Sequence, residues 1–256
     1  ENMFRNLSNH QLSHSCLVED MDSGQLSRRD NLSCRLNSTG GVLICVEKKD
    51  IDTFQSPEER AQLLINQQQY QEAINVLSHA ALVSNISTAP QCYLRAKAFI
   101  QLGKFDSALL DLEKAVRLHP QNVRYFEQQA FVLRKLDRYN EAITALDKAI
   151  KLEPANGKLY RDKGIALYKQ SKFSDSIKLL ELSLNMQESP HLTYFYLSMA
   201  YHTLFKFAKA LENVDRAIAI KSEVADYHIR RAMILTGLGR KVEAVESNAR
   251  AASIKQ

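Results

Sequence analysis

Apolar residues recur from about Ser56 to Gln256 in pairs of short runs, and each run has helical spacing. Because one face of a helix returns about every 3.6 residues, each run predicts one helix and each pair predicts a helical hairpin. The runs of the second pair contain Cys92, Ala96, Phe99 and Ile100, then Ala108, Leu109, Leu112, Ala115 and Val116. A short turn separates the two runs and ends in an aromatic residue at Tyr70, Phe105, Tyr139, Phe173 and Phe207.

The hairpin pattern itself repeats. A small residue in the middle of each copy recurs after one step of 35 residues and then at steps of 34, at Ala73, Ala108, Ala142, Ser176, Ala210 and Ala244. Small residues also fill positions 8 and 27 of every copy, which lets two helices cross closely. A single hairpin cannot bury both of its apolar faces, so the pattern predicts hairpins stacked into a solenoid. The expected repeats span residues 56–88, 89–122, 123–156, 157–190, 191–224 and 225–256.

This register of small, aromatic and small residues resembles the tetratricopeptide repeat (TPR) family, and the resemblance covers residues 56–256. It implies an all-α, right-handed TPR solenoid of six helix-turn-helix repeats. The chain departs from the family in lacking its frequent tryptophan at position 4. The last copy also departs, with Lys241, Asn248 and Ala252 where aromatic or aliphatic residues are usual. These changes are either drift or a more polar outer face, with which the last hairpin would act as its own cap.

Residues 1–55 are of another kind, rich in serine, asparagine and charge without sustained helical periodicity. They carry eight acidic and six basic residues, a net −2, so the chain's net +5 leaves +7 for the repeats. Such a segment predicts an extended, largely irregular N-terminal arm. Within it, residues 41–46 predict a short strand after a glycine turn. This strand is expected to lack a sheet partner in its own chain, and either to join a neighbour's sheet edge or to pack over the first helix as a cap.

The remaining composition argues against catalysis and cofactors. No catalytic or phosphate-binding motif is present, and the cysteines at positions 16, 34, 45 and 92 fit no zinc pattern. We therefore expect no enzyme, no cofactor, no metal and no small-molecule substrate. No apolar stretch is long enough to span a membrane, and no secretory signal pattern begins the chain, so no membrane insertion and a reducing, cytoplasmic location are expected.

The family resemblance implies that partners bind a concave groove lined by the first helix of each repeat. The residues expected there are Tyr93, Lys97, Arg124, Phe131, Arg134, Lys135, Lys158, Arg161, Tyr168, Lys169, Phe195, Met199 and Met233. This groove is basic in its centre and apolar toward its C-terminal half, which suits a segment with acidic residues followed by large apolar ones. Alternatively, these charges form only a solvated face. The two-carboxylate clamp for chaperone tails needs a lysine–asparagine pair that no copy contains at the required positions.

Three functions follow as hypotheses, all with other proteins or RNA as partners. The first is a non-catalytic scaffold within a multi-subunit assembly that uses both the groove and the N-terminal arm. By analogy, a cytoskeletal or ciliary complex is one setting, because acidic tubulin surfaces suit a basic array. The second is an adaptor or receptor for an acidic-plus-apolar peptide. The third and weakest is an RNA-associated helical repeat protein, because a net +7 is modest and no base-reading pair recurs.

Overall fold

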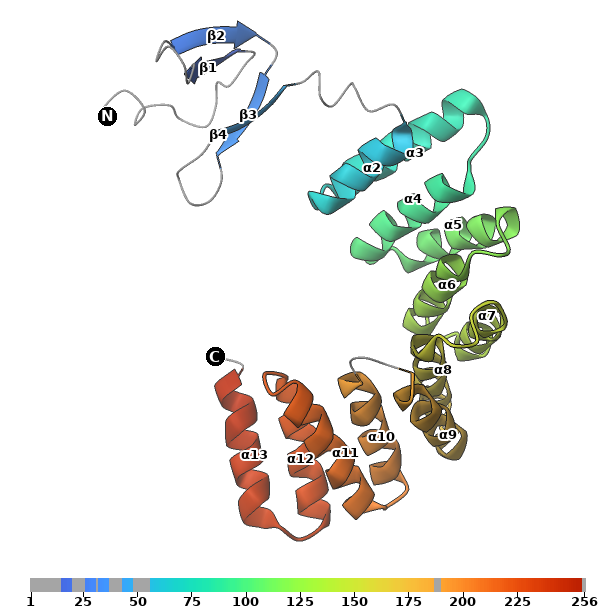
Figure 1. Ribbon diagram of the computed structural model, residues 1–256, viewed down its shortest axis with the longest axis vertical. Coiled ribbons are helices and arrows are strands. Elements are labelled where there is room, and N and C mark those ends of the chain that lie inside the picture. The colour runs from blue at the N-terminus through green and yellow to red at the C-terminus, as the bar shows by residue number, and fades with distance from the viewer. Residues whose placement is uncertain are drawn as a thin grey trace. The chain divides into compact units, whose positions relative to one another are not determined.

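The computed structural model describes residues 15–19, 26–30, 32–36, 43–47, 56–186 and 190–254 (Figure 1). By its internal contacts the chain divides into two compact units, residues 1–85 and 86–256. This division places the first hairpin with the N-terminal segment. The boundary that we expect between residues 55 and 56 stays a prediction.

The first unit contains four short strands and one helical hairpin. Strands β1 (Ser15–Glu19) and β2 (Leu26–Asp30) pair antiparallel, as do β3 (Leu32–Leu36) and β4 (Leu43–Glu47). The strand expected at residues 41–46 is thus present as β4, with Cys45 opposite Cys34. Its partner strand lies in the same chain, so the expectation of a strand without a sheet of its own was wrong. The other three strands were missed because five residues give too short an alternation to recognise.

Helices α2 (Pro57–Asn66) and α3 (Tyr70–Ser84) complete the first unit. Helix α2 begins at a proline, which suits a first helical position because it needs no backbone N–H there. The hydroxyl of Ser56 caps this helix by accepting a hydrogen bond from the backbone N–H of Glu59 at 3.3 Å. Ala61 and Ala73 are fully buried where the two helices cross.

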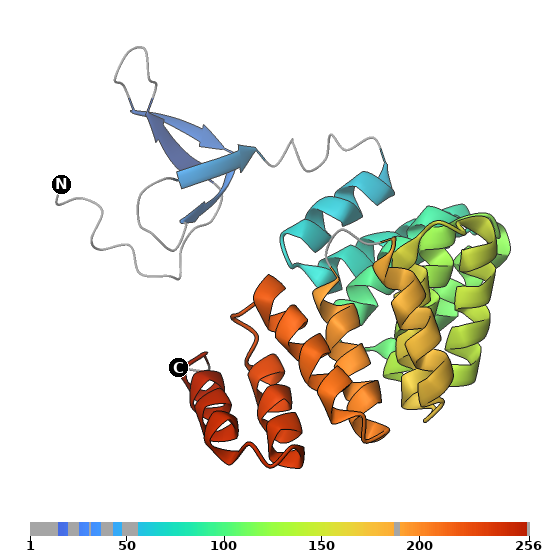
Figure 2. The same ribbon diagram turned by 60° about the horizontal axis from the view of Figure 1, so that its bottom comes forward.

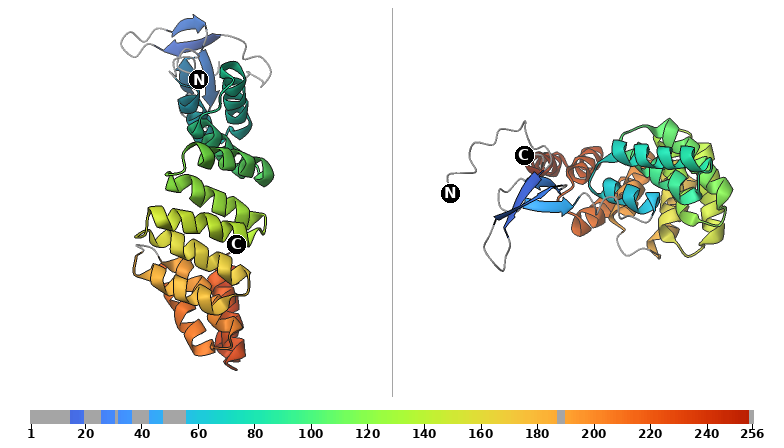
Figure 3. Two further views of the ribbon diagram at one scale, coloured as in Figure 1. Left: turned by 90° about the vertical axis from the view of Figure 1, so that its right-hand side faces the viewer. Right: turned by 90° about the horizontal axis from the view of Figure 1, so that it is seen from above.

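The second unit contains five hairpins, and all its described segments are helical or turns. The helices are α4 (Ala89–Gln101), α5 (Phe105–Leu118), α6 (Val123–Lys135), α7 (Tyr139–Leu152), α8 (Gly157–Lys169), α9 (Phe173–Leu184), α10 (His191–Thr203), α11 (Phe207–Ile220), α12 (Ala225–Gly237) and α13 (Lys241–Ile254). Each helix packs against its neighbours in the chain, which gives the predicted all-α solenoid of stacked hairpins (Figures 1 and 2). The two views in Figure 3 show the same succession of hairpins.

The core of the second unit is a series of clusters of buried aliphatic, small and aromatic side chains along the array. The leucine or valine at position 24 is fully buried in the first four hairpins of this unit, at Leu112, Leu146, Leu180 and Val214, whereas Asn248 at this position of the last hairpin is exposed. Small residues at the helix crossings, such as Ala96, Ala108 and Ala142, have no exposed surface. At one crossing Gly164 is so close to Leu180 that an added Cβ atom would lie 2.8 Å from its Cγ. The predicted close crossings are therefore confirmed at these positions.

The turn within each hairpin uses one residue in the left-handed conformation. Position 15 has a positive φ in all six copies, at Gln68, Gly103, Asp137, Ser171, Phe205 and Gly239. A left-handed residue lets the chain reverse after the first helix, and glycine adopts it without steric cost. Only two of the six copies use glycine, so the other four are held in this conformation by the packing of their helices.

Hydrogen-bonded pairs join consecutive hairpins. Nζ of Lys163 lies 2.5 Å from Oδ1 of Asp147, and Nε of Arg231 lies 2.7 Å from Oδ1 of Asp215. In both pairs the acid is at position 25 of one repeat and the base at position 7 of the next. Because these side chains are partly exposed, each pair contributes little to stability.

Candidate partner-binding face

The first helices of successive hairpins lie side by side within the second unit. Helix α10 contacts both α8 and α12 in addition to its own chain neighbours. This arrangement brings one side of the first helices together as a continuous surface. We call this surface the inner face, and it contains the predicted groove residues of α4, α6, α8, α10 and α12.

Two arginines share one buried carboxylate at the centre of the inner face. Oδ1 of Asp162 lies 3.1 Å from Nη2 of Arg161, and Oδ2 lies 3.9 Å from Nη2 of Arg134. The three side chains are only 11–17% exposed. Nε of Arg134 is buried and has no acceptor among the described residues. This arginine–aspartate cluster therefore keeps one positive charge in excess in a partly desolvated position, where charge acts more strongly than in water.

Aromatic rings extend from this cluster toward the C-terminal hairpins. The rings of Tyr168 and Tyr196 are 6.1 Å apart, edge to face, and those of Phe195 and Tyr227 are 4.8 Å apart. Phe195 also meets Tyr196 edge to face at 5.8 Å. We call these four residues the aromatic row. Tyr168, Phe195 and Tyr196 are only half-buried, so they present apolar surface next to the excess positive charge.

Burial keeps two tyrosines of the aromatic row, Tyr196 and Tyr227, neutral by raising their pKa values. Burial raises the pKa of Tyr196, and the carboxylate of Asp162 adds to this effect while Arg134 opposes it. Burial, with the nearby carboxylate of Asp226, raises the pKa of Tyr227 to about 12. The hydroxyl of Tyr227 is hydrogen-bonded to Nδ1 of His191 at 2.7 Å. Burial and the positive charges of Lys221 and Arg161 lower the pKa of this histidine.

Several predicted groove lysines are engaged within the chain. Lys158 pairs with Glu127, and so carries no free charge. Nζ of Lys97 lies 6.0 Å from the ring centre of Tyr93, and Nζ of Lys135 lies 5.7 Å from that of Phe131. These cation–π contacts cover aromatic faces but leave the ammonium groups available to solvent.

The structure thus brings together part of the predicted set. Arg134, Arg161 and Tyr168 meet around Asp162 and Tyr196, and Phe195 joins the aromatic row. Arg124 and Lys169 are exposed, Met199 is half-buried and Met233 is 53% exposed, and none of these four takes part in the cluster. Sequence reasoning missed Asp162 and Tyr196, both at position 6 of their repeats. Position 6 holds a different residue in every copy, so no repeat signal marked these two residues.

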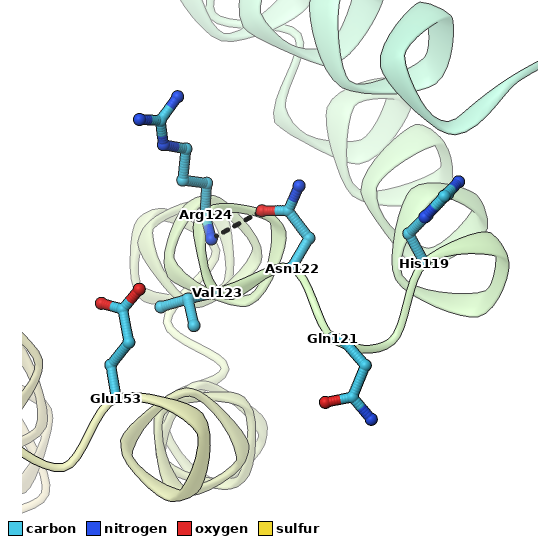
Figure 4. Close-up of a pocket in the computed structure, with 6 residues that line it drawn as sticks. All are labelled: His119, Gln121, Asn122, Val123, Arg124 and Glu153. Carbon is cyan, nitrogen blue, oxygen red and sulfur yellow. Dashed lines mark hydrogen bonds between the residues drawn. The ribbon is translucent and has the colours of Figure 1, made fainter.

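A shallow hollow of about 350 Å³ lies at the edge of the array, beside the N-terminus of α6 (Figure 4). It is lined by His119, Gln121, Asn122, Val123, Arg124 and Glu153. Oδ1 of Asn122 accepts a hydrogen bond from the backbone N–H of Arg124 at 3.1 Å and so caps the helix. Figure 4 shows that the side chains of His119, Arg124 and Glu153 extend in different directions. They do not converge on one point, as the groups of a catalytic site must.

The described helices also bear on membrane association: none of them is both long and apolar enough to cross a bilayer.

Comparison with known proteins agrees with the repeat pattern. The family description "TPR repeat" matches residues 130–171, and "Tetratricopeptide repeat" matches residues 58–122 and 93–130. No curated protein matches the chain by sequence.

Solved structures with a similar fold are numerous, and three illustrate them. MamA from Desulfovibrio magneticus RS-1 is 21% identical with a TM-score of 0.59, over 65% of this chain and 94% of that one. The chain matched in the Cut9–Hcn1 hetero-tetramer of the APC/C is 17% identical with a TM-score of 0.64, over 77% of this chain and 39% of that one. YrrB, described as a TPR protein with an unusual peptide-binding site, is 18% identical with a TM-score of 0.53, over 70% and 91%. At these identities the likeness concerns the fold alone, while the two family descriptions, which together match residues 58–171, identify tetratricopeptide repeats in that part of the chain.

Proposed function

We propose that this protein is a non-catalytic scaffold for protein–protein interaction, and that its inner face seats a segment of a partner protein. The observation that carries the proposal is the arginine–aspartate cluster beside the aromatic row. An excess arginine charge attracts a carboxylate, and half-buried rings supply apolar contact area next to it. The complementary segment carries an acidic residue followed by large apolar side chains.

The comparisons support this proposal at the level of protein class. One structural neighbour is a subunit of a hetero-tetramer and another has a peptide-binding site. The inner face could hold a permanent partner, as in a scaffold, or bind a peptide transiently, as in an adaptor. The adaptor function is therefore the second candidate. A cytoskeletal or ciliary setting stays a prediction.

The proposal is tested by reversing charge on the inner face. Arg134→Glu with Lys135→Glu introduces repulsion at the cluster and should lower the affinity of an acidic partner at least about tenfold. Arg117→Glu with Lys151→Glu is the matched control, because it changes net charge equally at exposed positions of α5 and α7. The readout is quantitative crosslinking in native lysate. Partners that survive the inner-face reversal as well as they survive the control would refute the assignment.

A second comparison separates scaffold from adaptor. A shorter chain beginning at Ser56 keeps all six hairpins but lacks residues 1–55. If the shorter chain loses the partner, and the full chain is crosslinked to it through residues 1–55, the protein is a scaffold that uses both parts. Retention, with crosslinks along Lys97, Lys135 and Lys169, identifies an adaptor that uses the inner face alone. A steep loss of binding with salt, with RNA in the complex, would instead favour the third function.

A further inference from the structure

Phe205 is in an unfavourable backbone conformation on the surface of the second unit. It lies in the turn between α10 and α11, with φ of 57°, and 80% of it is exposed. A bulky side chain in the left-handed region is an outlier, because its Cβ crowds the following carbonyl. The same turn position holds glycine in two other repeats, so the fold does not require an aromatic residue there.

The strain at Phe205 is not repaid by burial within the protein. Its ring meets the edge of Phe207 at 6.0 Å and 82°, and this contact leaves most of the side chain in solvent. An exposed aromatic residue that costs stability is a candidate for a binding residue, since outliers of this kind concentrate at functional sites. Aromatic residues are also among those that dominate binding energy at protein interfaces.

The next hairpin extends the apolar surface around Phe205. A Cβ added to Gly237 would lie 2.7 Å from the Phe207 ring, so the C-terminal end of α12, just before its turn to α13, packs against the first residue of α11. Figures 1 and 2 both show these two turns side by side on one edge of the unit. That second turn and the start of α13 carry Leu238, which is 38% exposed, and Val242, which is 74% exposed. We call Phe205, Leu238 and Val242 the apolar tip.

Positive charge surrounds the apolar tip. Lys206 and Lys241 are exposed and have no acidic partner among the described residues. Nζ of Lys209 lies 5.5 Å from the ring centre of Tyr201, and no salt bridge joins this lysine to an acid among the described residues. The nearest acids on the two second helices, Glu212 and Glu243, are already paired with Arg216 and Arg240. The edge therefore presents an apolar tip within a basic rim of Lys206, Lys209 and Lys241.

We propose that the apolar tip is a second docking surface, separate from the inner face, for an acidic protein segment that carries an aromatic or large aliphatic side chain. The basic rim steers the acidic residues, and the exposed ring of Phe205 packs against the apolar one. Two neighbouring turns give a contact only a few residues long, which suits a linear segment and not a folded domain. This surface would let the protein hold a second partner while the inner face is occupied.

The experiment is a selection of random short peptides, displayed on phage, against the full chain. The enriched sequences should combine Asp or Glu with aromatic or large aliphatic residues. Phe205→Gly should lower their affinity at least about tenfold, as expected for an interface anchor. Its thermal unfolding midpoint should not fall, because glycine removes the strain, and this separates lost binding from lost folding.

Two further variants complete the test. Ser171→Gly removes the same left-handed backbone strain at the corresponding turn of the preceding repeat, and it should leave the affinity for the peptides unchanged. Lys206→Glu with Lys241→Glu should lower the affinity more at low salt than at high salt, because exposed charges are screened.

Three outcomes would overturn the proposal. One is that no enriched peptide depends on Phe205. Another is that Arg134→Glu with Lys135→Glu abolishes binding of the selected peptides. They would then occupy the inner face, in agreement with the proposed function and against this second surface. The third is Phe205-dependent binding to vesicles of phosphatidylserine and phosphatidylcholine with no peptide selected, which would identify a lipid surface as the occupant.

Discussion

Gly164 allows a sharp test of how closely the helices pack. It occupies position 8 of the fourth repeat, where the other copies have alanine or serine. A Cβ at this position would lie 2.8 Å from Cγ of Leu180 and 3.3 Å from the backbone oxygen of Ser176. Leu180 is fully buried, and the hydroxyl of Ser176 donates a hydrogen bond to the backbone oxygen of Gly164 at 2.7 Å. Neither neighbour can move away freely.

Two opposing effects decide the result of Gly164→Ala. Alanine is a better helix former than glycine, which favours the variant by about 0.8–1 kcal/mol. Overpacking at a tight core site costs about 1–3 kcal/mol. The structure therefore predicts a net loss of about 1 kcal/mol in the free energy of unfolding, although the change improves helix propensity.

A second substitution should reverse the sign of that effect. Leu180→Ala alone costs about 2–5 kcal/mol, because it leaves a cavity in the core. In the Leu180→Ala background the two closest contacts, both with Leu180, are gone and only the 3.3 Å approach to the Ser176 backbone oxygen remains, so Gly164→Ala should stabilise the protein by about 0.5–1 kcal/mol. Val214→Ala is the matched control, since Val214 lies in α11 and leaves the crossing of α8 and α9 intact.

The assay is urea unfolding followed by circular dichroism for all single and double variants. Gly164→Ala should destabilise the wild-type and Val214→Ala backgrounds and stabilise only the Leu180→Ala background. Stabilisation by Gly164→Ala in all three backgrounds would refute the reasoning, because helix propensity would then outweigh packing at this crossing.

Three further predictions concern stability. Ala142→Leu should lower the free energy of unfolding by about 1–3 kcal/mol, because Ala142 is fully buried at a helix crossing, and an unchanged melting temperature would contradict the assigned register. The pKa values of Tyr201 and Tyr227 are raised to about 12, so stability should decline as the pH rises from about 10 through 12; phenolate absorbance that titrates fully near pH 10 in the folded protein would contradict this. The pKa values of His191 and His202 are lowered by burial, so stability should fall as the pH drops below about 6.5, and imidazole NMR titrations with ordinary midpoints would argue against it.

Local and periodic features of the fold were predictable from the sequence. Helices α3, α5 and α7 begin at Tyr70, Phe105 and Tyr139, the aromatic residues that mark the ends of the expected turns. The small residues at the crossings are buried as expected. Both patterns are strong signals because they recur from repeat to repeat, and because they depend on contacts within one hairpin or between neighbouring hairpins.

The candidate site was less predictable because it depends on which side chains reach across helices. Arg134 in α6 extends to Asp162 in α8, and no pattern within either repeat encodes that pairing. The sequence predicted Lys158 to be one of the basic groove residues, but it pairs with Glu127 from the first helix of the preceding hairpin. The groove therefore stays a prediction, and which of its charges remain unpaired depends on contacts between helices that no repeat pattern encodes.

The nearest-neighbour packing of the second unit has a mechanical consequence. Each helix of α4–α13 contacts mainly the helices before and after it in the chain, so no long-range tie resists separation of the ends. Under a stretching force, such an array peels from its termini one hairpin at a time. Each unfolded repeat of 34 residues extends to about 110–120 Å of chain. The second unit would therefore lengthen in steps of nearly equal size, one for each hairpin. A partner segment bound across several first helices would make those hairpins unfold together, in one larger step and at a higher force.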